Sequence, residues 1–191
     1  REDHSQPEYS YPFFLELPLH MAIPMIFLLL VVFAWSSGDG NRDFLNLGQF
    51  FTQLFSYDFL GERSKNELID YIGALIGVGY MVAGYATNVG HEFTHRTKDK
   101  IALLEGRWLL SVSCNSDFSI EHVYNHHINV GTDKDPATAR RGENVYAFSI
   151  RSTIMGHLSA WKLESKTLQK KGIGIFSIKN RMITGYLMSI M

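Results

Sequence analysis

Two long segments with almost no charged residues place the strongest constraint on this sequence. Residues 17–35 contain no Asp, Glu, Lys or Arg, and residues 68–90 carry only Asp70, close to one end. A helix rises about 1.5 Å per residue, so the first segment nearly matches a hydrocarbon core of roughly 30 Å and the second exceeds it. We therefore predict an all-α, integral membrane fold with two spanning helices. For the first segment, the alternative is a buried helix of a soluble α protein.

The connecting region and the charges predict how the chain lies in a membrane. Residues 44–60 carry apolar side chains at helical spacing, which predicts an interfacial amphipathic helix or a surface helix packed on the spans. Fourteen of the 18 Lys and Arg residues follow His95, whereas residues 36–67 hold three. By the positive-inside rule, we expect the residues after the second span to face the cytoplasm.

Composition narrows the classes of function and of metal site. The net charge of −1 argues against a nucleic-acid partner, which a strongly basic surface would favour. Cys114 is the single cysteine, so neither an intrachain disulfide nor a cysteine-rich metal site can form. The chain starts at Arg1 and stops at Met191 inside an apolar run. We therefore expect residues 1–191 to form one domain that is incomplete at both ends.

Five of the eight histidines lie between residues 91 and 127. His91 and His95 are four residues apart, as are His122 and His126, so each pair lies on one face of a helix. His127 is turned about 100° further round, towards a neighbouring site. Five imidazoles exceed what one zinc ion takes, and they suit two metal ions with nitrogen-rich ligand sets. We predict that these five are metal ligands. The other histidines are expected to be structural: His4, His20 and His157.

The stretch from His91 to His95 is also a literal H-E-x-x-H motif. In zinc proteases this motif supplies two metal ligands and a general-base glutamate. A membrane zinc metalloprotease is therefore an alternative function. Two features count against it: no extension with a third ligand follows the motif, and the second cluster adds three histidines that a single zinc ion does not need.

Three stretches of the chain resemble the membrane-bound non-haem di-iron enzymes, a superfamily that includes fatty-acid desaturases, alkane monooxygenases and xylene monooxygenases. Residues 91–96 and 121–127 look like the first two histidine boxes of the superfamily. The loop 135–143 resembles the alkane and xylene monooxygenase branch rather than ordinary desaturases. The resemblance covers roughly residues 68–165. The family's later histidine box has no counterpart, because His157 matches no box.

This resemblance implies an oxidoreductase of the alkane 1-monooxygenase type. Such an enzyme uses two iron ions and dioxygen to hydroxylate a methyl group of an alkane or alkyl-aromatic. The alternative within the superfamily is a fatty-acyl desaturase. The resemblance further implies a multi-pass protein of the bacterial inner membrane, with histidine boxes at the cytoplasmic helix ends. Because some iron ligands lie outside these residues, we expect the fragment to be inactive alone.

Several other side chains are candidates for supporting roles. Carboxylates that orient ligating histidines are expected nearby, and Glu92, Glu121 and Asp135 are the main candidates, with Asp117 and Asp133 also available. Small residues in the second span suit either close helix packing, as the Gly73-x-x-x-Gly77 spacing indicates, or an apolar substrate channel. They are Gly73, Ala74, Gly77, Gly79, Ala83 and Gly84.

The chain has neither a dinucleotide-binding glycine pattern nor the cysteines for an iron–sulfur cluster, so electrons must come from outside. A rubredoxin- or ferredoxin-type donor with its reductase is the expected partner. Exposed cations would favour the approach of such an acidic protein. Alternatively, they contact lipid headgroups and determine membrane topology. The candidates are Lys98, Lys100, Lys134, Arg140, Arg141, Lys162, Lys166, Lys170 and Lys171.

Overall fold

The structure is a computed structural model that describes residues 12–39 and 42–191. Within these ranges every regular element is a helix and no strand forms, which confirms the predicted all-α class. The elements are α1 (Pro12–His20), α2 (Ala22–Ser37), η1 (Phe44–Asn46), α3 (Leu47–Phe55), α4 (Phe59–Arg63), α5 (Leu68–Met81), the π-helix η2 (Val82–Ala86), α6 (Thr87–His95), α7 (Lys100–Val112), α8 (Phe118–Glu121), the π-helix η3 (His122–His126), α9 (His127–Asn129), α10 (Val145–Lys170) and α11 (Arg181–Ile190).

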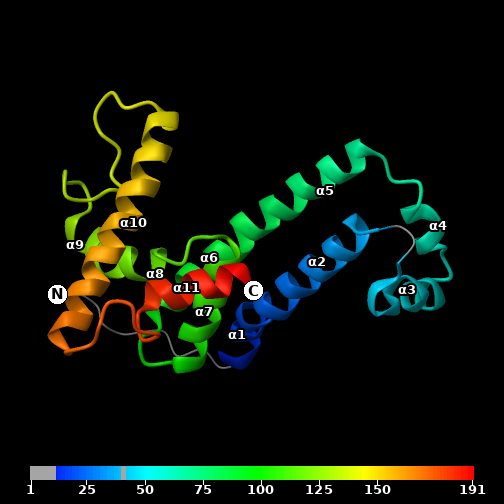
Figure 1. Cartoon of the computed structure of the whole chain (residues 1–191), viewed down its shortest axis with the longest axis horizontal. Coiled ribbons are helices and arrows are strands. Elements are labelled where there is room, and N and C mark those ends of the chain that lie inside the picture. Colours follow the sequence, from blue (N-terminus) through cyan, green and yellow to red (C-terminus); the bar gives the residue numbers. More distant parts are fainter. Residues whose placement is uncertain (1–11, 40–41) are drawn as a thin grey trace.

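Two helical rods are long and apolar enough to cross a membrane. The first runs over Phe13–Ser37 and joins α1 to α2; the second runs over Leu68–His95 and joins α5, η2 and α6. The second rod continues beyond the predicted span 68–90 through both histidines of the first cluster, as their helical spacing predicts. Figure 1 shows α2 and α5 side by side, with α3 and α4 at one end and the remaining helices gathered at the other.

A buried cation closes the end of the span pair near α3 and α4. The Arg63 guanidinium lies 4.7 Å from the Trp35 ring centroid and donates to the backbone oxygens of Asp39 and Arg42. The Trp35 indole donates to Asp43 Oδ1 at 2.8 Å, and the same oxygen accepts the Gly48 N–H at the start of α3. The connection between the spans is therefore tied to the end of α2.

The predicted amphipathic helix over residues 44–60 forms as two short helices instead of one. Ser56 adopts a left-handed backbone conformation (φ 53°), which ends α3 before α4 begins. Phe50, Leu54 and Phe55 of α3 are exposed, as an interfacial helix requires, whereas Leu47 and Phe51 are half-buried.

Polar contacts close the opposite end of the span pair. Arg96, directly after α6, lies 3.1 Å from the Glu16 carboxylate of α1. His20 Nδ1 lies 2.5 Å from Glu105 Oε2 of α7. The Tyr85 hydroxyl donates to the Pro18 carbonyl at 3.1 Å. The two rods are thus joined at both ends, and α7 is anchored to the first of them.

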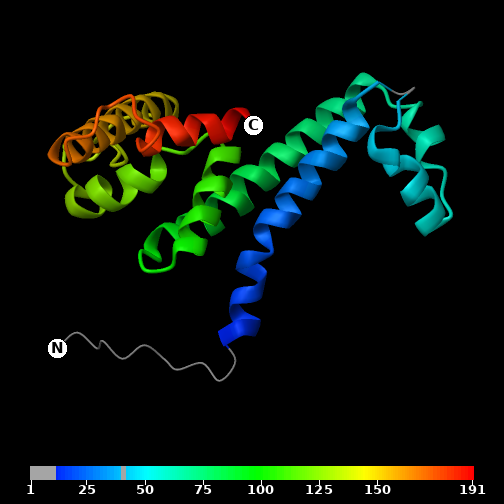
Figure 2. The same ribbon diagram turned by 60° about the horizontal axis from the view of Figure 1, so that its bottom comes forward.

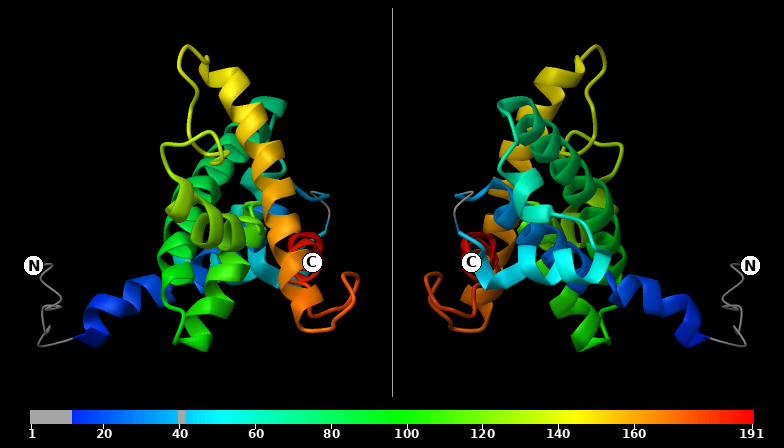
Figure 3. Two further views of the ribbon diagram at one scale, coloured as in Figure 1. Left: turned by 90° about the vertical axis from the view of Figure 1, so that its left-hand side faces the viewer. Right: turned by 90° about the vertical axis from the view of Figure 1, so that its right-hand side faces the viewer.

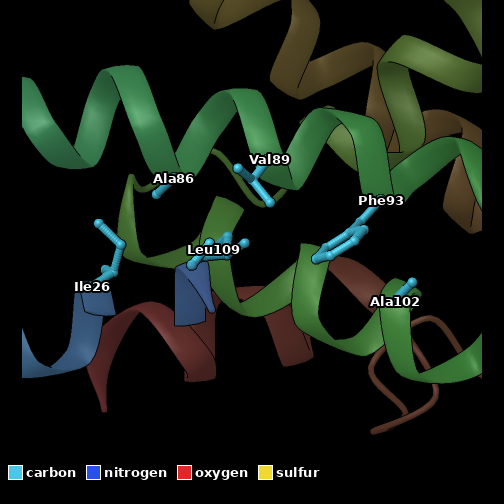
Figure 4. Packing of buried hydrophobic residues seen from close by; sticks show 7 residues of the cluster. Ile26, Ala86, Val89, Phe93, Ala102 and Leu109 are labelled. Atoms are coloured by element: carbon cyan, nitrogen blue, oxygen red, sulfur yellow. The ribbon is translucent and has the colours of Figure 1, made fainter. Parts of the chain in front are cut away.

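The closest helix contact in this region lies between α6 and α7. A Cβ added to Gly106 would lie 2.7 Å from Phe93 Cβ, and one added to Gly90 would lie 2.9 Å from Leu110 Cγ. Figure 4 shows the apolar core at this contact, where Phe93 and Val89 meet Leu109 and Ala102. The predicted packing glycines behave differently, since a Cβ on Gly73, Gly77, Gly79 or Gly84 would meet no atom within 4 Å. Close packing therefore uses Gly90 and Gly106, not the Gly73-x-x-x-Gly77 pair, within the described residues.

A second apolar cluster joins α8 to α10 and α11. Ile120, Ala160 and Met182 are fully buried there. The nearly buried Glu164 of α10 accepts hydrogen bonds from the Arg181 guanidinium at 2.6 and 2.9 Å, and from the Arg181 backbone N–H. Figures 2 and 3 show α10 and α11 beside the α8–α9 segment, at the end of the molecule that carries both histidine clusters.

Candidate metal centre

The first histidine pair lies at the end of the second membrane rod. His91 and His95 are one turn apart on α6, and their Nε2 atoms are 3.0 Å apart. His91 Nε2 is also 2.8 Å from the Nε2 of His122, the first residue of η3. Potential ligand atoms of these three histidines all lie within 4.8 Å of one another. The structure thus brings the two predicted clusters together.

A π-helical turn shapes the second cluster. In η3 the His127 backbone N–H bonds to the His122 carbonyl, the i→i+5 pattern of a π-helix, so residues five apart come to one face. As a result His127 Nε2 lies 3.0 Å from His122 Nε2. An α-helix would instead turn His127 about 100° beyond His126, so the π turn accounts for its approach to His122. The Phe118 ring stacks on the His122 ring at 4.5 Å and holds it in place.

The Nδ1 atom of His126 faces Asp135 and not the other four histidines. Its Nδ1 lies 2.9 Å from Oδ2 of Asp135, a carboxylate that is almost fully buried. A neutral imidazole that donates from Nδ1 keeps the Nε2 lone pair free for a metal ion. Burial opposes ionisation of Asp135, but hydrogen bonds from Thr138, Ala137 and His126 hold the pKa of its carboxyl below the usual value.

The loop that carries Asp135 is held by one arginine. Arg151 of α10 lies 2.6 and 2.8 Å from the two oxygens of Glu143, and it also donates to the carbonyls of Pro136 and Thr138. The hydrogen bond from Arg151, together with the Arg140 N–H, lowers the pKa of Glu143 to about 2. The loop 135–143 is thus fixed at both ends, which fixes Asp135 against His126.

The other predicted carboxylates occupy different surroundings. Glu121 is buried and accepts a hydrogen bond from the Asn125 side chain, and burial raises the pKa of its carboxyl. Glu92 is exposed, and its Oε1 lies 3.4 Å from Arg96 Nε rather than on a histidine. Asp133 is exposed. Asp117 lies 3.7 Å from His157. Asp135 is therefore the carboxylate that contacts a predicted ligand directly.

The donor set fits a metal ion. Two nitrogens that each lie about 2.1 Å from one ion at roughly right angles are about 3 Å apart, close to the Nε2 separations of 2.8–3.0 Å in this cluster. Burial, followed by repulsion from neighbouring histidines, lowers the pKa of His122 to about 4. Its imidazole is therefore neutral at pH 7 and offers a lone pair. A nitrogen-rich set of this kind suits iron, copper, nickel or zinc.

Two histidines that were expected to be structural have specific partners. His20 bonds to Glu105, as described above. His157 of α10 is hydrogen-bonded through Nε2 to the Tyr186 hydroxyl of α11, and it lies in the same pocket as His122 and His126. Sequence spacing carries no signal for His157, because Tyr186 and Asp117 are distant from it in the chain. His4 lies outside the described residues.

Comparison with known proteins identifies the family. Residues 69–190 match the family model described as fatty acid desaturase. The chain belongs to the fatty acid desaturase family. This result confirms the resemblance drawn from the three sequence stretches and the membrane character of the fold.

Relatives of this fatty acid desaturase family member carry a more specific name. The chain is 34% identical over 119 residues to alkane 1-monooxygenase 1 of Pseudomonas aeruginosa, covering 62% of this chain and 31% of the relative. It is 29% identical over 171 residues to an alkane 1-monooxygenase of Ectopseudomonas oleovorans, covering 90% and 36%. It is 35% identical over 132 residues to that of Acinetobacter baylyi, covering 69% and 32%. The chain thus spans about a third of the length of the curated relatives it matches.

The family assignment bears on the protease alternative. A zinc protease needs the glutamate of its H-E-x-x-H motif to act as a general base at the metal. Here the Glu92 carboxylate is exposed and lies beside Arg96. Together with the family match, this placement counts against a protease.

Proposed function

We propose that this chain is the part of a membrane-bound di-iron monooxygenase that carries the first two histidine boxes. The proposed reaction is hydroxylation of a terminal or benzylic methyl group, in an alkane or an alkyl-aromatic. The observation that supports it most is the convergence of four Nε2 atoms at the end of an apolar rod. The relatives named alkane 1-monooxygenase favour hydroxylation over the desaturase alternative.

Five residues would hold the metal: His91, His95, His122, His126 and His127. Two iron ions, when bound, would supply dioxygen activation, and the further ligands would come from outside these residues. The protein's own contribution is to orient the imidazoles. Asp135 holds the Nδ1 side of His126, and Phe118 holds the ring plane of His122. Glu121, buried beside Asn125, is proposed to support the same helix turn.

An apolar substrate is proposed to reach this site from the bilayer. A groove of about 600 Å³ runs between α2 and the junction of α5 with η2. Met25, Leu29, Met81 and Tyr85 are among its lining residues. Its surface is almost wholly apolar, so it suits a hydrocarbon chain and not a charged substrate. The open glycines of α5 leave further room along the same rod.

Electrons are proposed to come from a rubredoxin- or ferredoxin-type protein and its reductase. The nine lysines and arginines predicted to meet such a donor are all exposed. A surface of that charge favours the approach of an acidic partner. The same excess of cations after His95 supports a multi-pass arrangement in a bacterial inner membrane with the histidines towards the cytoplasm.

The proposal is tested with the full-length protein in membranes, supplied with a redox partner and isotopically labelled dioxygen. Octane, xylene and a fatty acyl substrate are compared in parallel. Labelled alcohol from octane or xylene is the expected result. An alkene from the acyl substrate, with no label incorporated and no alcohol, would assign the desaturase alternative. Metal analysis of the purified protein is expected to find about two irons per chain, whereas one zinc without iron would indicate a protease.

A further inference from the structure

A chamber of about 390 Å³ lies between α10 and the α8–η3 segment. Two of the predicted metal ligands, His122 and His126, form part of one wall, and residues Ser152 to His157 of α10 form part of the opposite wall. Gly156 keeps this space open, because a Cβ added there would meet only Glu121 Cγ, at 4.0 Å. The chamber therefore connects the surface of α10 with the back of the histidine cluster.

Polar side chains interrupt the otherwise apolar lining of the chamber. Asn115, Asp117, Ser152 and Thr153 supply hydrogen-bonding groups around it. A space of this size with several polar partners holds ordered water readily. The apolar groove between α2 and α5 lies on other elements, so the two spaces suit different molecules.

His157 lies where this chamber meets solvent. Its side chain is 42% exposed, whereas that of Asp117 is 15% exposed. Nε2 is hydrogen-bonded to the Tyr186 hydroxyl, and Nδ1 lies 3.7 Å from Asp117 Oδ1. The titratable groups that line the chamber with it are Cys114, Asp117, Glu121, His122 and His126, and Tyr186 faces it from α11. His157 belongs to none of the histidine boxes, so ligation does not explain its position.

We propose that this chamber admits water to the metal centre and that His157 transfers protons from solvent into it. The inference rests on the proposed function. In that reaction one oxygen atom of dioxygen enters the substrate C–H bond and the other leaves as water. The second half consumes two protons, and the redox partner supplies two electrons. An imidazole held by Tyr186 and open to solvent is suited to deliver those protons.

Two variants of the full-length protein test the two parts of this proposal. His157→Gln keeps an amide for the Tyr186 hydroxyl but cannot take up and release a proton, and Gly156→Leu fills the chamber while leaving His157 in place. Each is expected to lower alcohol formation by roughly tenfold or more, a modest effect for a proton-transfer group. More of the consumed dioxygen should then appear as hydrogen peroxide. Added imidazole should restore a His157→Ala variant in part.

Water access to the metal centre can also be measured without turnover. The relaxation of water protons by the paramagnetic metal reports how closely water approaches it. Gly156→Leu is expected to weaken this relaxation at least twofold, while His157→Gln leaves it unchanged. Leu158→Ala is the matched control, because Leu158 is the next residue on α10, is exposed and lies outside the chamber lining.

The outcomes separate this inference from the proposed function. If the unmodified protein forms alcohol and His157→Gln forms it at the same rate and coupling, the role of His157 is refuted. If Gly156→Leu leaves water relaxation unchanged, the chamber is no water path, whatever the reaction is. Absence of alcohol from the unmodified protein would instead refute the proposed function, and the relaxation result would still decide the water path.

Discussion

Asp135 Oδ2 lies 2.9 Å from His126 Nδ1, and only 2% of Asp135 is exposed. The pair joins a loop that resembles the monooxygenase branch to a histidine of the second box. A buried carboxylate in this position fixes the tautomer and the direction of the ring, and so prepares Nε2 for a metal ion.

Asp135→Asn should weaken iron binding about 10- to 100-fold, the usual effect of removing a carboxylate that orients a metal-binding histidine. Iron content after dialysis against graded chelator measures the change. Asp133→Asn is the matched control, because Asp133 is exposed and close by in the same loop. Equal iron retention in both variants would show that Asp135 has no orienting role.

Replacement of any of the five predicted ligands with alanine should abolish hydroxylation and lower iron content in the full-length protein. His91 and His122 should have the largest effects on iron, because the Nε2 atom of each lies within 3.0 Å of two other histidine Nε2 atoms. Metal analysis and product assays measure the result. Full activity in two or more of the five variants would contradict the assignment.

Gly106→Ala should destabilise the protein by about 1–3 kcal/mol, the usual cost of an overpacked contact. The new Cβ would lie 2.7 Å from Phe93 Cβ and 3.1 Å from the Gly90 carbonyl oxygen, so α6 and α7 would have to separate. Thermal unfolding in membranes or detergent measures the change. Gly77→Ala is the control, because the space beside Gly77 is open and alanine favours a helix.

The pairing of Glu143 with Arg151 predicts a pH-dependent loop. The pKa of Glu143 is lowered from 4.5 to about 2, so the carboxylate contributes stability that is fully present above pH 4.5 and is lost as the pH falls towards 2. The protection of residues 131–143 against hydrogen exchange, relative to the unfolded chain at the same pH, should therefore fall as the pH is lowered across this window. Glu143→Gln should raise exchange at neutral pH and remove the pH dependence. An unchanged profile in Glu143→Gln would contradict this account.

Cysteine labelling tests the predicted orientation. Ser64→Cys, beside α4, should react with a membrane-impermeant reagent from outside intact cells, whereas Lys166→Cys in α10 should react only after lysis. Both positions are exposed, so accessibility alone does not separate them. Labelling of position 166 in intact cells would reverse the assignment.

Features governed by local rules were predictable from the sequence. The spans follow from two long segments with almost no charge, and the pairing of His91 with His95 follows from α-helical spacing. The π turn at His122 was not predictable, because a backbone hydrogen bond between residues five apart leaves no mark in the sequence pattern of side chains. It changes which histidine faces which, and so brings His127 to His122.

Contacts between distant segments were also beyond the sequence. Asp135-Pro136 has the composition of an ordinary turn, and only the fold reveals that its carboxylate is buried against His126. The glycines with the membrane-packing spacing proved open, while Gly90 and Gly106 form the tight contact. In the same way, nothing near His157 in the sequence indicates its partner Tyr186.

The ties at the two ends of the membrane rods have a mechanical consequence. At one end Arg63 of the connection packs on the Trp35 ring of α2, and at the other the pairing of Glu16 with Arg96 joins α1 to the end of α6. A helical hairpin that is held at both ends resists separation of its two helices there, but between the ends other described elements leave most of its sides uncovered. A hydrophobic molecule would therefore enter laterally from the bilayer, near the middle of the two helices between α2 and α5, rather than from either end of the hairpin.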